Sequence, residues 1–369
     1  MPVRVCFVSL GLYSYANPDA TDTAGGAERQ LYLLSQKFSD STDVHAVVAK
    51  YGQPSVEFRD GITFHRSYSP DPEKSPLLMP YSSIKLMRAM QRADADVYVY
   101  RGDPQKASIV AAIAALLGKK FVYNLANDSN ITAEYQSLPP HFRHLFGWSL
   151  ENAAEIIAQT PKQEALVNER FGTDSIVIPN GYPRADEISG YDEREVALWV
   201  GRLDQDQKRP HLFLDLVERL PNHEFILIGP RGFDESYCNS IIERANSIDN
   251  VAYTGRVDPN EVDRYYRRAS VLVNTSAYEG FPNTFLEAWR QGVPIASLDV
   301  NPGRYLDTNI AGYANGDIAR LKTDTELFLT DVCQRRKVGE KSRRIFESRY
   351  TIDTIASKYE ETIRKAART

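Results

Sequence analysis

Two carboxylates stand eight residues apart in the segment EGFPNTFLE, which runs from Glu279 to Glu287. The apolar run SVLVNT before it is typical of a strand, and the residues from Thr284 onward are typical of a helix. The first turn of such a helix presents backbone N–H groups and the positive end of the helix dipole, so it favours an anion. Two readings follow from this spacing. The carboxylates flank a polyhydroxyl ligand, or the segment is a capped helix with two solvated carboxylates.

Two further segments could approach a phosphate. In GRLDQDQKRP, which begins at Gly201, Arg202 offers a forked donor and Lys208 a point charge, a pairing suited to a diphosphate. Gly25 and Gly26 open a helix pattern, and glycines allow a backbone to approach a phosphate closely. Read alone, the first segment is equally typical of a polar loop and the second of an ordinary turn into a helix.

Other chemistries lack their sequence signatures. The dinucleotide fingerprint G-x-G-x-x-G, the phosphate loop G-x-x-x-x-G-K-[ST], the nucleophile elbow G-x-S-x-G and the zinc motif H-E-x-x-H do not occur. His141 and His144 lie three apart without a third ligand, so we expect no metal site. The three cysteines form no C-x-x-C pair, which fits a reducing compartment.

The surrounding sequence alternates between strand and helix patterns. Buried-strand patterns occur at residues 3–10, 44–50, 96–100, 120–126, 153–160 and 175–180, with helix patterns between several of them. A second alternating set begins at residues 196–201 and includes EFILIG, NVAYTG, SVLVNT and PIASLD. The alternation predicts an α/β fold of two Rossmann-like, doubly wound parallel-sheet domains with a cleft between them. Asp60-Gly61 predicts a hairpin within the first domain.

Length and composition set the domain organisation. The 369 residues are 42% hydrophobic and 25% charged, as in ordinary globular proteins, and exceed what one domain needs. A net charge of −5 argues against a nucleic-acid partner. The stretch 181–195 is charged and lacks an apolar period, so we interpret it as a linker. We expect an N-terminal domain at residues 1–182, a C-terminal domain at 183–345, and a C-terminal helix at 346–369 that packs back toward the N-terminal domain.

Five segments occur in a familiar order, and with them the sequence resembles family four of the retaining glycosyltransferases. They are GGAER at 25–29, IPNG at 178–181, GRLDQDQK at 201–208, YTGRVD at 253–258 and EGFPNTFLE at 279–287. The resemblance spans nearly the whole chain and is most specific from Ile178 to Leu298. It implies the GT-B architecture, with an acceptor-binding N-terminal domain and a C-terminal domain that binds a nucleotide-sugar donor.

The resemblance also implies roles for matching positions. Glu287 would bind the ribose hydroxyls, and Glu279 would hold the transferred sugar together with the backbone from Gly280 to Asn283. The implied catalytic residues are Glu279, Arg202, Lys208 and Asp128. The implied donor-binding residues are Gly25 and Gly26 at the phosphates, Arg256 and Val257 at the base, and Gly280, Phe281, Pro282, Asn283, Thr284 and Glu287. The resemblance implies no cofactor and no obligatory metal.

The implied function is a retaining hexosyltransferase. It would move a sugar from a nucleotide-diphosphate sugar to a glycan or lipid-linked acceptor in surface-glycan or glycoconjugate synthesis. One departure from the family pattern keeps alternatives open. The family often has a histidine after a strand such as KFVYNLA, whereas this chain reads Asn124-Leu125-Ala126-Asn127-Asp128, so Asp128 or Asn127 would contact the sugar instead. The alternatives are a catalytically silent, nucleotide-sugar-binding or scaffolding subunit, or a nucleotide-sugar 2-epimerase.

The sequence also bears on location. It has no run of 18 apolar residues, and its first residues lead directly into a strand pattern, so we expect a cytoplasmic protein. Residues 81–92 predict a helix with Ile84, Met87 and Met90 near one face and Lys85, Arg88 and Arg92 near another. That pattern suits peripheral attachment to an anionic membrane, with the preceding segment PLLMP as a further apolar contact, or an ordinary surface helix.

Overall fold

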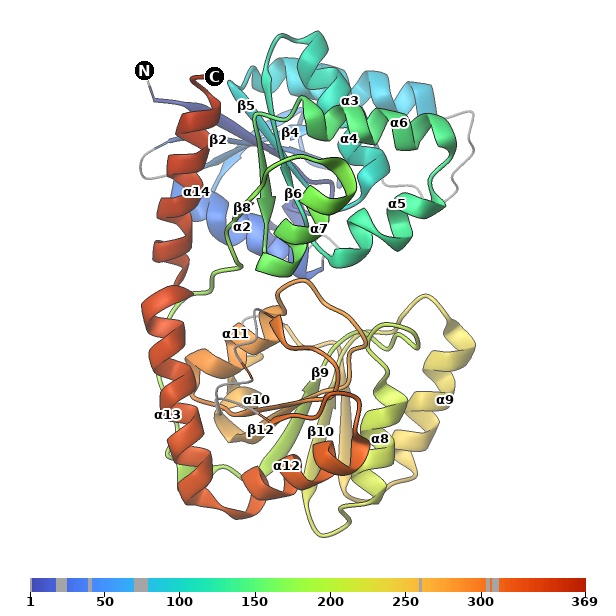
Figure 1. The fold of residues 1–369 in the computed structure, drawn as a ribbon, viewed down its shortest axis with the longest axis vertical. Coiled ribbons are helices and arrows are strands. Elements are labelled where there is room, and N and C mark those ends of the chain that lie inside the picture. The colour runs from blue at the N-terminus through green and yellow to red at the C-terminus, as the bar shows by residue number, and fades with distance from the viewer. Residues whose placement is uncertain are drawn as a thin grey trace. The chain divides into compact units, whose positions relative to one another are not determined.

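The computed structural model describes residues 2–17, 25–38, 42–69, 79–258, 261–302, 306 and 312–369. They form two compact units, one of Met1–Gly181 with Ile352–Thr369 and one of Tyr182–Thr351 (Figure 1). Each unit contains one sheet, and the pairs of neighbouring strands in the described residues are parallel apart from β3 with β4. The predicted α/β fold with two doubly wound sheets is confirmed.

The sheet of the first unit has the strand order β3-β4-β2-β1-β5-β6-β7-β8. Its strands are β1 (Arg4–Val8), β2 (Asp43–Val48), β3 (Val56–Arg59), β4 (Ile62–Arg66), β5 (Val97–Arg101), β6 (Lys120–Asn124), β7 (Glu155–Ala158) and β8 (Ile176–Val177). Its helices are α1 (Tyr13–Ala16), α2 (Gly26–Phe38), α3 (Met79–Ala93), α4 (Pro104–Leu116), the short 3₁₀ helix η2 (Asp128–Ile131), α5 (Ala133–Ser137), α6 (Pro140–Glu151), α7 (Pro161–Phe171) and α14 (Ile352–Ala366).

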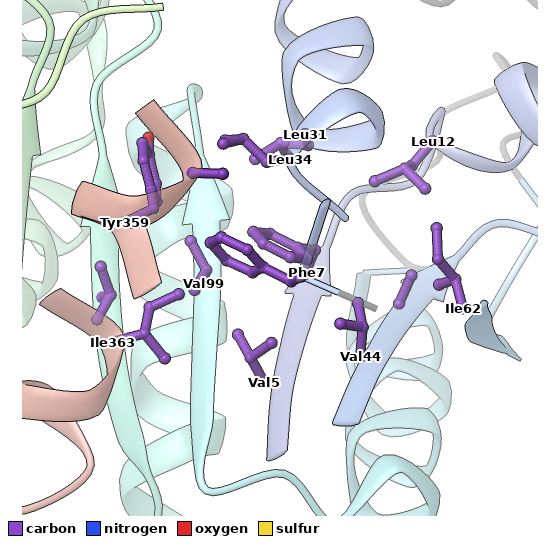
Figure 2. Packing of buried hydrophobic residues seen from close by; sticks show 14 of the residues in the cluster. Val5, Phe7, Leu12, Leu31, Leu34, Val44, Ile62, Val99, Tyr359 and Ile363 are labelled. Atoms are coloured by element: carbon purple, nitrogen blue, oxygen red, sulfur yellow. The ribbon is translucent and has the colours of Figure 1, made fainter. Parts of the chain in front are cut away.

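Alternate residues of the central strand β1 enter two hydrophobic cores, because successive strand side chains point to opposite faces. Phe7 packs with residues of α2 and of the C-terminal helix α14, including Leu34 and Tyr359 (Figure 2). Cys6, on the other face, joins residues of α3, α4 and α6. Each large apolar side chain buried in this way contributes about 1.5–3 kcal/mol. The two cores explain why helices cover both faces of the sheet.

The predicted hairpin is present at the edge of this sheet. β3 pairs antiparallel with β4, and Asp60 and Gly61 in the turn have φ values of 53° and 76°. Positive φ at both central residues is the geometry that a two-residue hairpin turn requires. The short helix α1 follows β1 in the same unit.

The sheet of the second unit has the order β11-β10-β9-β12-β13-β14. Its strands are β9 (Val196–Val200), β10 (Glu224–Ile228), β11 (Val251–Gly255), β12 (Ala269–Asn274), β13 (Ile295–Ser297) and β14 (Gly312–Tyr313). Its helices are the 3₁₀ helix η3 (Tyr191–Glu193), α8 (Pro210–Glu218), α9 (Glu235–Asn246), α10 (Asp263–Arg268), α11 (Asn283–Arg290), α12 (Ile318–Thr330) and α13 (Val332–Arg349).

The stretch interpreted as a linker is packed into the second unit. Tyr182 is fully buried, and so is most of Arg194. The Arg194 guanidinium donates to the carbonyl oxygens of Gln291 and Gly292 over 2.7 and 3.1 Å. The boundary between the two units falls after Gly181, at the start of the stretch 181–195 that we interpret as a linker, and Tyr182 and Arg194 within that stretch are buried. A buried arginine can be satisfied by backbone carbonyls without a carboxylate.

Candidate functional site

The candidate site lies in the second unit, where the order of its strands reverses. β9 has β10 on one side and β12 on the other, so the loops after β9 and β12 meet at the carboxyl edge of the sheet. Ligands of open α/β sheets bind at such a point. The backbones here are close. A Cβ atom on Gly229, directly after β10, would lie 1.6 Å from the carbonyl oxygen of Gly201, so only glycine fits.

Hydrogen bonds tie the two loops together. The Thr275 hydroxyl accepts from Nε1 of Trp199 at 2.9 Å and donates to the carbonyl oxygen of Lys208 at 2.7 Å. The backbone N–H of Ala277 donates to the carbonyl oxygen of Gln207 over 2.8 Å. These bonds fix the loop that carries Lys208 against the loop that leads to Glu279.

Lys208 and Glu279 form an ion pair through Nζ and Oε1. The Lys208 side chain is 22% exposed and the Glu279 side chain 10% exposed, so the pair is sheltered but can be reached from solvent. In a sheltered site each charge depends strongly on its partner. A diphosphate that attracted Lys208 would therefore release Glu279 for a new hydrogen-bond donor.

Glu287 lies in α11 with only 7% of its surface exposed. The Tyr182 hydroxyl donates to Oε1 over 2.7 Å, and the Tyr266 hydroxyl donates to Oε2 over 2.8 Å. Burial and the charge of Glu287 raise the pKa of Tyr266 well above its usual value, so this phenol stays a donor. The structure thus holds Glu287 by both oxygens.

Arg202 follows β9 and extends along an exposed aromatic ring. Its guanidinium carbon lies 4.7 Å from the ring centre of Phe233, which is 88% exposed. Nη2 of Arg202 is 3.9 Å from Asp204, and its Nε is buried without a hydrogen-bond partner among the described residues. A cation held by an aromatic face keeps donors for an incoming anion.

The other residues of the second unit that the sequence predicts to bind a donor lie in two loops and at the start of α11. Gly280, Phe281 and Pro282 are buried, and the Phe281 ring packs 5.1 Å from Tyr350 and 6.2 Å from Trp289, which anchors the loop. Asn283 begins α11 and Thr284 follows it, one residue earlier than the sequence indicates. Arg256 and Val257 directly follow β11.

Gly25 and Gly26 belong to the first unit, where α2 begins at Gly26. The Gly25 N–H donates to Oε2 of Glu28 over 3.0 Å. Glu28 also lies over Gly11, whose added Cβ would be 3.2 Å from the Glu28 side chain. The glycines therefore sit at the start of a helix, as expected, and Glu28 covers part of their surroundings.

Asp128 and Asn127 also lie in the first unit, each with a structural partner. The Asp128 carboxylate accepts from Nζ of Lys162 at 2.7 Å and from Nε2 of Gln163 at 3.0 Å. Asn127 precedes η2, and its Oδ1 lies 3.5 Å from the backbone nitrogen of Ser129. Both oxygens of Asp128 are thus engaged within the unit, and its sugar contact stays a prediction.

Sequence reasoning missed three residues of the candidate site. Tyr182 lies in the stretch interpreted as a linker, although it follows IPNG directly. Tyr266 lies outside every motif that the sequence offers, and so does Phe233. Their roles depend on contacts with Glu287 and Arg202 across the chain, which no local pattern encodes.

The arrangement of His, Cys, Asp and Glu side chains bears on metal binding. Within the ranges that the structure describes, no three His, Cys, Asp or Glu side chains gather in a metal-binding arrangement. His141 and His144 both lie on α6.

Two doubly wound α/β units of this kind define the GT-B class of fold. Residues 24–185 match the family described as Glycosyltransferase Family 4, and residues 194–331 match Glycosyl transferases group 1. The chain belongs to this glycosyltransferase family.

Individual relatives agree with this assignment. The chain is 31% identical over 173 residues to the lipopolysaccharide 1,6-galactosyltransferase of Escherichia coli, a match that covers 44% of this chain and 48% of the relative. Sucrose-phosphate synthase from Thermosynechococcus elongatus superposes with a TM-score of 0.78 at 18% identity, covering 98% of each chain. An Anabaena protein in complex with UDP and glucose superposes with a TM-score of 0.75 at 15% identity, and the match covers 98% of this chain and 99% of the Anabaena chain. The chain spans 36% to 63% of the length of three curated relatives that it matches.

Proposed function

We propose that this protein is a retaining glycosyltransferase that moves a sugar from a nucleotide-diphosphate sugar to a glycan or lipid-linked acceptor. The observation that carries the proposal is the group at the carboxyl edge of the second unit. There Glu279 is paired with Lys208, and Glu287 is held by two tyrosines. The UDP and glucose in the related Anabaena structure support a donor of this chemical class.

Each group has a task in that reaction. Lys208 leaves Glu279 to bind the diphosphate, and Glu279 then accepts from a hydroxyl of the transferred sugar. Arg202, held along Phe233, adds a second cation. The first turn of α11, after Pro282, adds backbone N–H groups and the helix dipole. These positive groups stabilise the negative charge that develops on the departing phosphate.

The reaction is proposed to need no divalent metal, because Lys208 and Arg202 take over the charge neutralisation. The test is release of nucleoside diphosphate from nucleotide sugars in excess EDTA, with Glu279→Gln as the comparison variant. The proposal expects release in EDTA that the variant strongly reduces. Loss of all release in EDTA, restored by a divalent cation, would refute metal independence.

A catalytically silent subunit is the second candidate. The observation that favours it is the occupied Asp128, which accepts from Lys162 and Gln163 at the place where relatives often have a histidine. Such a subunit would bind a nucleotide sugar but release no diphosphate over long incubation. Slow donor hydrolysis by the wild-type protein would exclude it.

Attachment to an anionic membrane is proposed for α3, with a narrower surface than the sequence suggests. Met90 is fully buried and cannot face a membrane, whereas Ile84 is 46% exposed and Arg88 is exposed. Lys85 lies over the Tyr81 ring at 4.3 Å. The segment PLLMP lies outside the residues whose side chains are described. Among the described helices, none is long and apolar enough to cross a bilayer.

Vesicle co-sedimentation tests this attachment. Binding to anionic vesicles should weaken as the salt concentration rises, because salt screens the attraction between the basic side chains and the anionic lipids. It should weaken further in a Lys85/Arg88→Glu double variant, because the reversed charges are repelled by the same lipids. A Lys341→Glu/Arg344→Glu variant on α13 carries the same charge change and should bind as the wild type does. No binding at low salt would leave a soluble acceptor as the better proposal.

A further inference from the structure

A buried carboxylate is clamped in the second unit by tyrosines from two separate segments. Tyr182 follows the boundary between the units, and Tyr266 lies on α10. Their hydroxyls donate to different oxygens of Glu287, over 2.7 and 2.8 Å. The terminal torsion of a glutamate is broad when nothing restrains it. Donors on both oxygens fix the plane of the carboxylate.

Among the described residues, the two tyrosines leave part of the acceptor capacity of Glu287 unused. An ionised carboxylate has about four acceptor positions, of which the two tyrosines occupy one on each oxygen. Both donors are neutral, so the negative charge keeps its attraction for further donors. Two adjacent hydroxyls on a ribose ring present donors to the two oxygens at once. A glutamate that served only to join helices would have no such preference for a diol.

Neighbouring contacts hold the tyrosines themselves in place. The Arg290 guanidinium lies over the Tyr182 ring, 4.6 Å from its centre. Arg290 also forms an ion pair with Asp263 of α10, the helix that carries Tyr266. The two hydroxyls therefore approach Glu287 from a connected framework, so loss of one hydroxyl need not collapse the site.

We propose that Tyr182 and Tyr266 are positioning residues, which orient the Glu287 carboxylate so that its free acceptor positions receive the 2′- and 3′-hydroxyls of the donor ribose. The inference rests on the proposed function, because it assigns two further residues to the same nucleotide site. It predicts that the tyrosine hydroxyls matter for a ligand with a ribose diol and not for one without it.

The test compares each nucleoside diphosphate with its 2′,3′-dideoxy counterpart by isothermal titration. UDP, GDP and ADP are titrated first, and the one that binds the wild-type protein is used. Tyr266→Phe and Tyr182→Phe keep the rings and remove only the hydroxyls. Tyr237→Phe is the matched control, since that hydroxyl bonds Nδ1 of His211 at 2.8 Å in the same unit. Glu287→Ala reports on the nucleotide site itself.

We expect the tyrosine variants to lose affinity for the nucleoside diphosphate with the ribose diol and to keep their affinity for its dideoxy counterpart. The wild type should prefer the form with the diol to the dideoxy form by about 10-fold or more, the scale of hydrogen bonds to a charged group. Each tyrosine variant should reduce that preference about 5-fold and leave dideoxy binding unchanged, and Tyr237→Phe should change neither. Equal losses for both ligands, or no loss, would overturn the inference. If Glu287→Ala also kept the full ribose preference, the proposed nucleotide site would fail instead.

Discussion

Replacing Lys208 by methionine measures what the sheltered ion pair contributes to the fold. Breaking a fully buried pair from one side costs about 3–5 kcal/mol, whereas an exposed pair contributes about 0–1 kcal/mol. With 22% and 10% of the two side chains exposed, the pair lies nearer the buried limit, and we expect a loss of about 2–3 kcal/mol. For a unit of this size that lowers the melting temperature by roughly 5–10 °C.

The opposite single change should cost less. Glu279→Gln leaves Lys208 with a flexible stem that can turn toward water, so we expect a loss of about 1 kcal/mol. The Lys208→Met/Glu279→Gln double variant should be more stable than Lys208→Met, because it removes the stranded charge. Calorimetric measurement of the free energy of unfolding for the wild type and these three variants gives the coupling energy of the pair as a double-mutant cycle.

Arg343→Met is the control for this cycle. Arg343 pairs with Glu347 one turn along α13 at 2.8 Å, and their side chains are 41% and 42% exposed. Its loss should cost at most about 0.5 kcal/mol. If Lys208→Met lowered the melting temperature no more than Arg343→Met does, or if the double variant were the least stable of all, the pair would not be sheltered as described.

Three further outcomes are expected. Arg202→Ala should lower kcat on the order of 10²-fold and change the donor KM less, since its charge acts mainly when the diphosphate departs; steady-state kinetics that showed only a KM effect would contradict this. Asp128→Ala should impair transfer and spare binding of nucleoside diphosphate, as measured by titration; full activity would place the sugar contact elsewhere. Burial lowers the pKa of His65 to about 4, with the charges of His45 and nearby arginines acting the same way. Between pH 6.5 and 4 the unfolded chain therefore binds a proton at His65 that the folded chain does not bind. Calorimetry should show the free energy of unfolding of the first unit falling by about 1.4 kcal/mol for each unit by which the pH falls from about 6.5 to about 4. A flat profile, or the same slope in His65→Gln, would refute it.

The alternating patterns predicted the fold because they report burial directly. Val196–Val200 is apolar throughout, and Ala269–Asn274 is buried throughout and mostly apolar, as is typical of buried parallel strands. The order of motifs also indicated which loops carry Lys208 and Glu279, since the carboxyl ends of neighbouring parallel strands meet at one edge. The direct pairing of these two side chains required the register of both loops, which sequence spacing does not give.

Other parts of the site could not be predicted from local patterns. Tyr182 and Tyr266 are separated from Glu287 in the sequence, and only the packing of α10 and of the segment that begins at Tyr182 against α11 brings their hydroxyls to it. Met90 has the spacing of a membrane-facing residue, yet it is buried because α3 packs that side on its own unit. A helical period reports which residues share a face but does not reveal what covers that face.

Binding of a nucleotide sugar by the second unit through Glu287 is the proposal on which the other functional predictions depend. Thermal unfolding with a panel of nucleoside diphosphates and nucleotide sugars tests it most directly, because a ligand that binds only the folded protein stabilises it by about 2.7 kcal/mol at 100 times its Kd. We expect at least one of these ligands to raise the melting temperature of the wild-type protein, and Glu287→Ala to remove most of that rise. No rise with any nucleotide, or an equal rise in the variant, would contradict it.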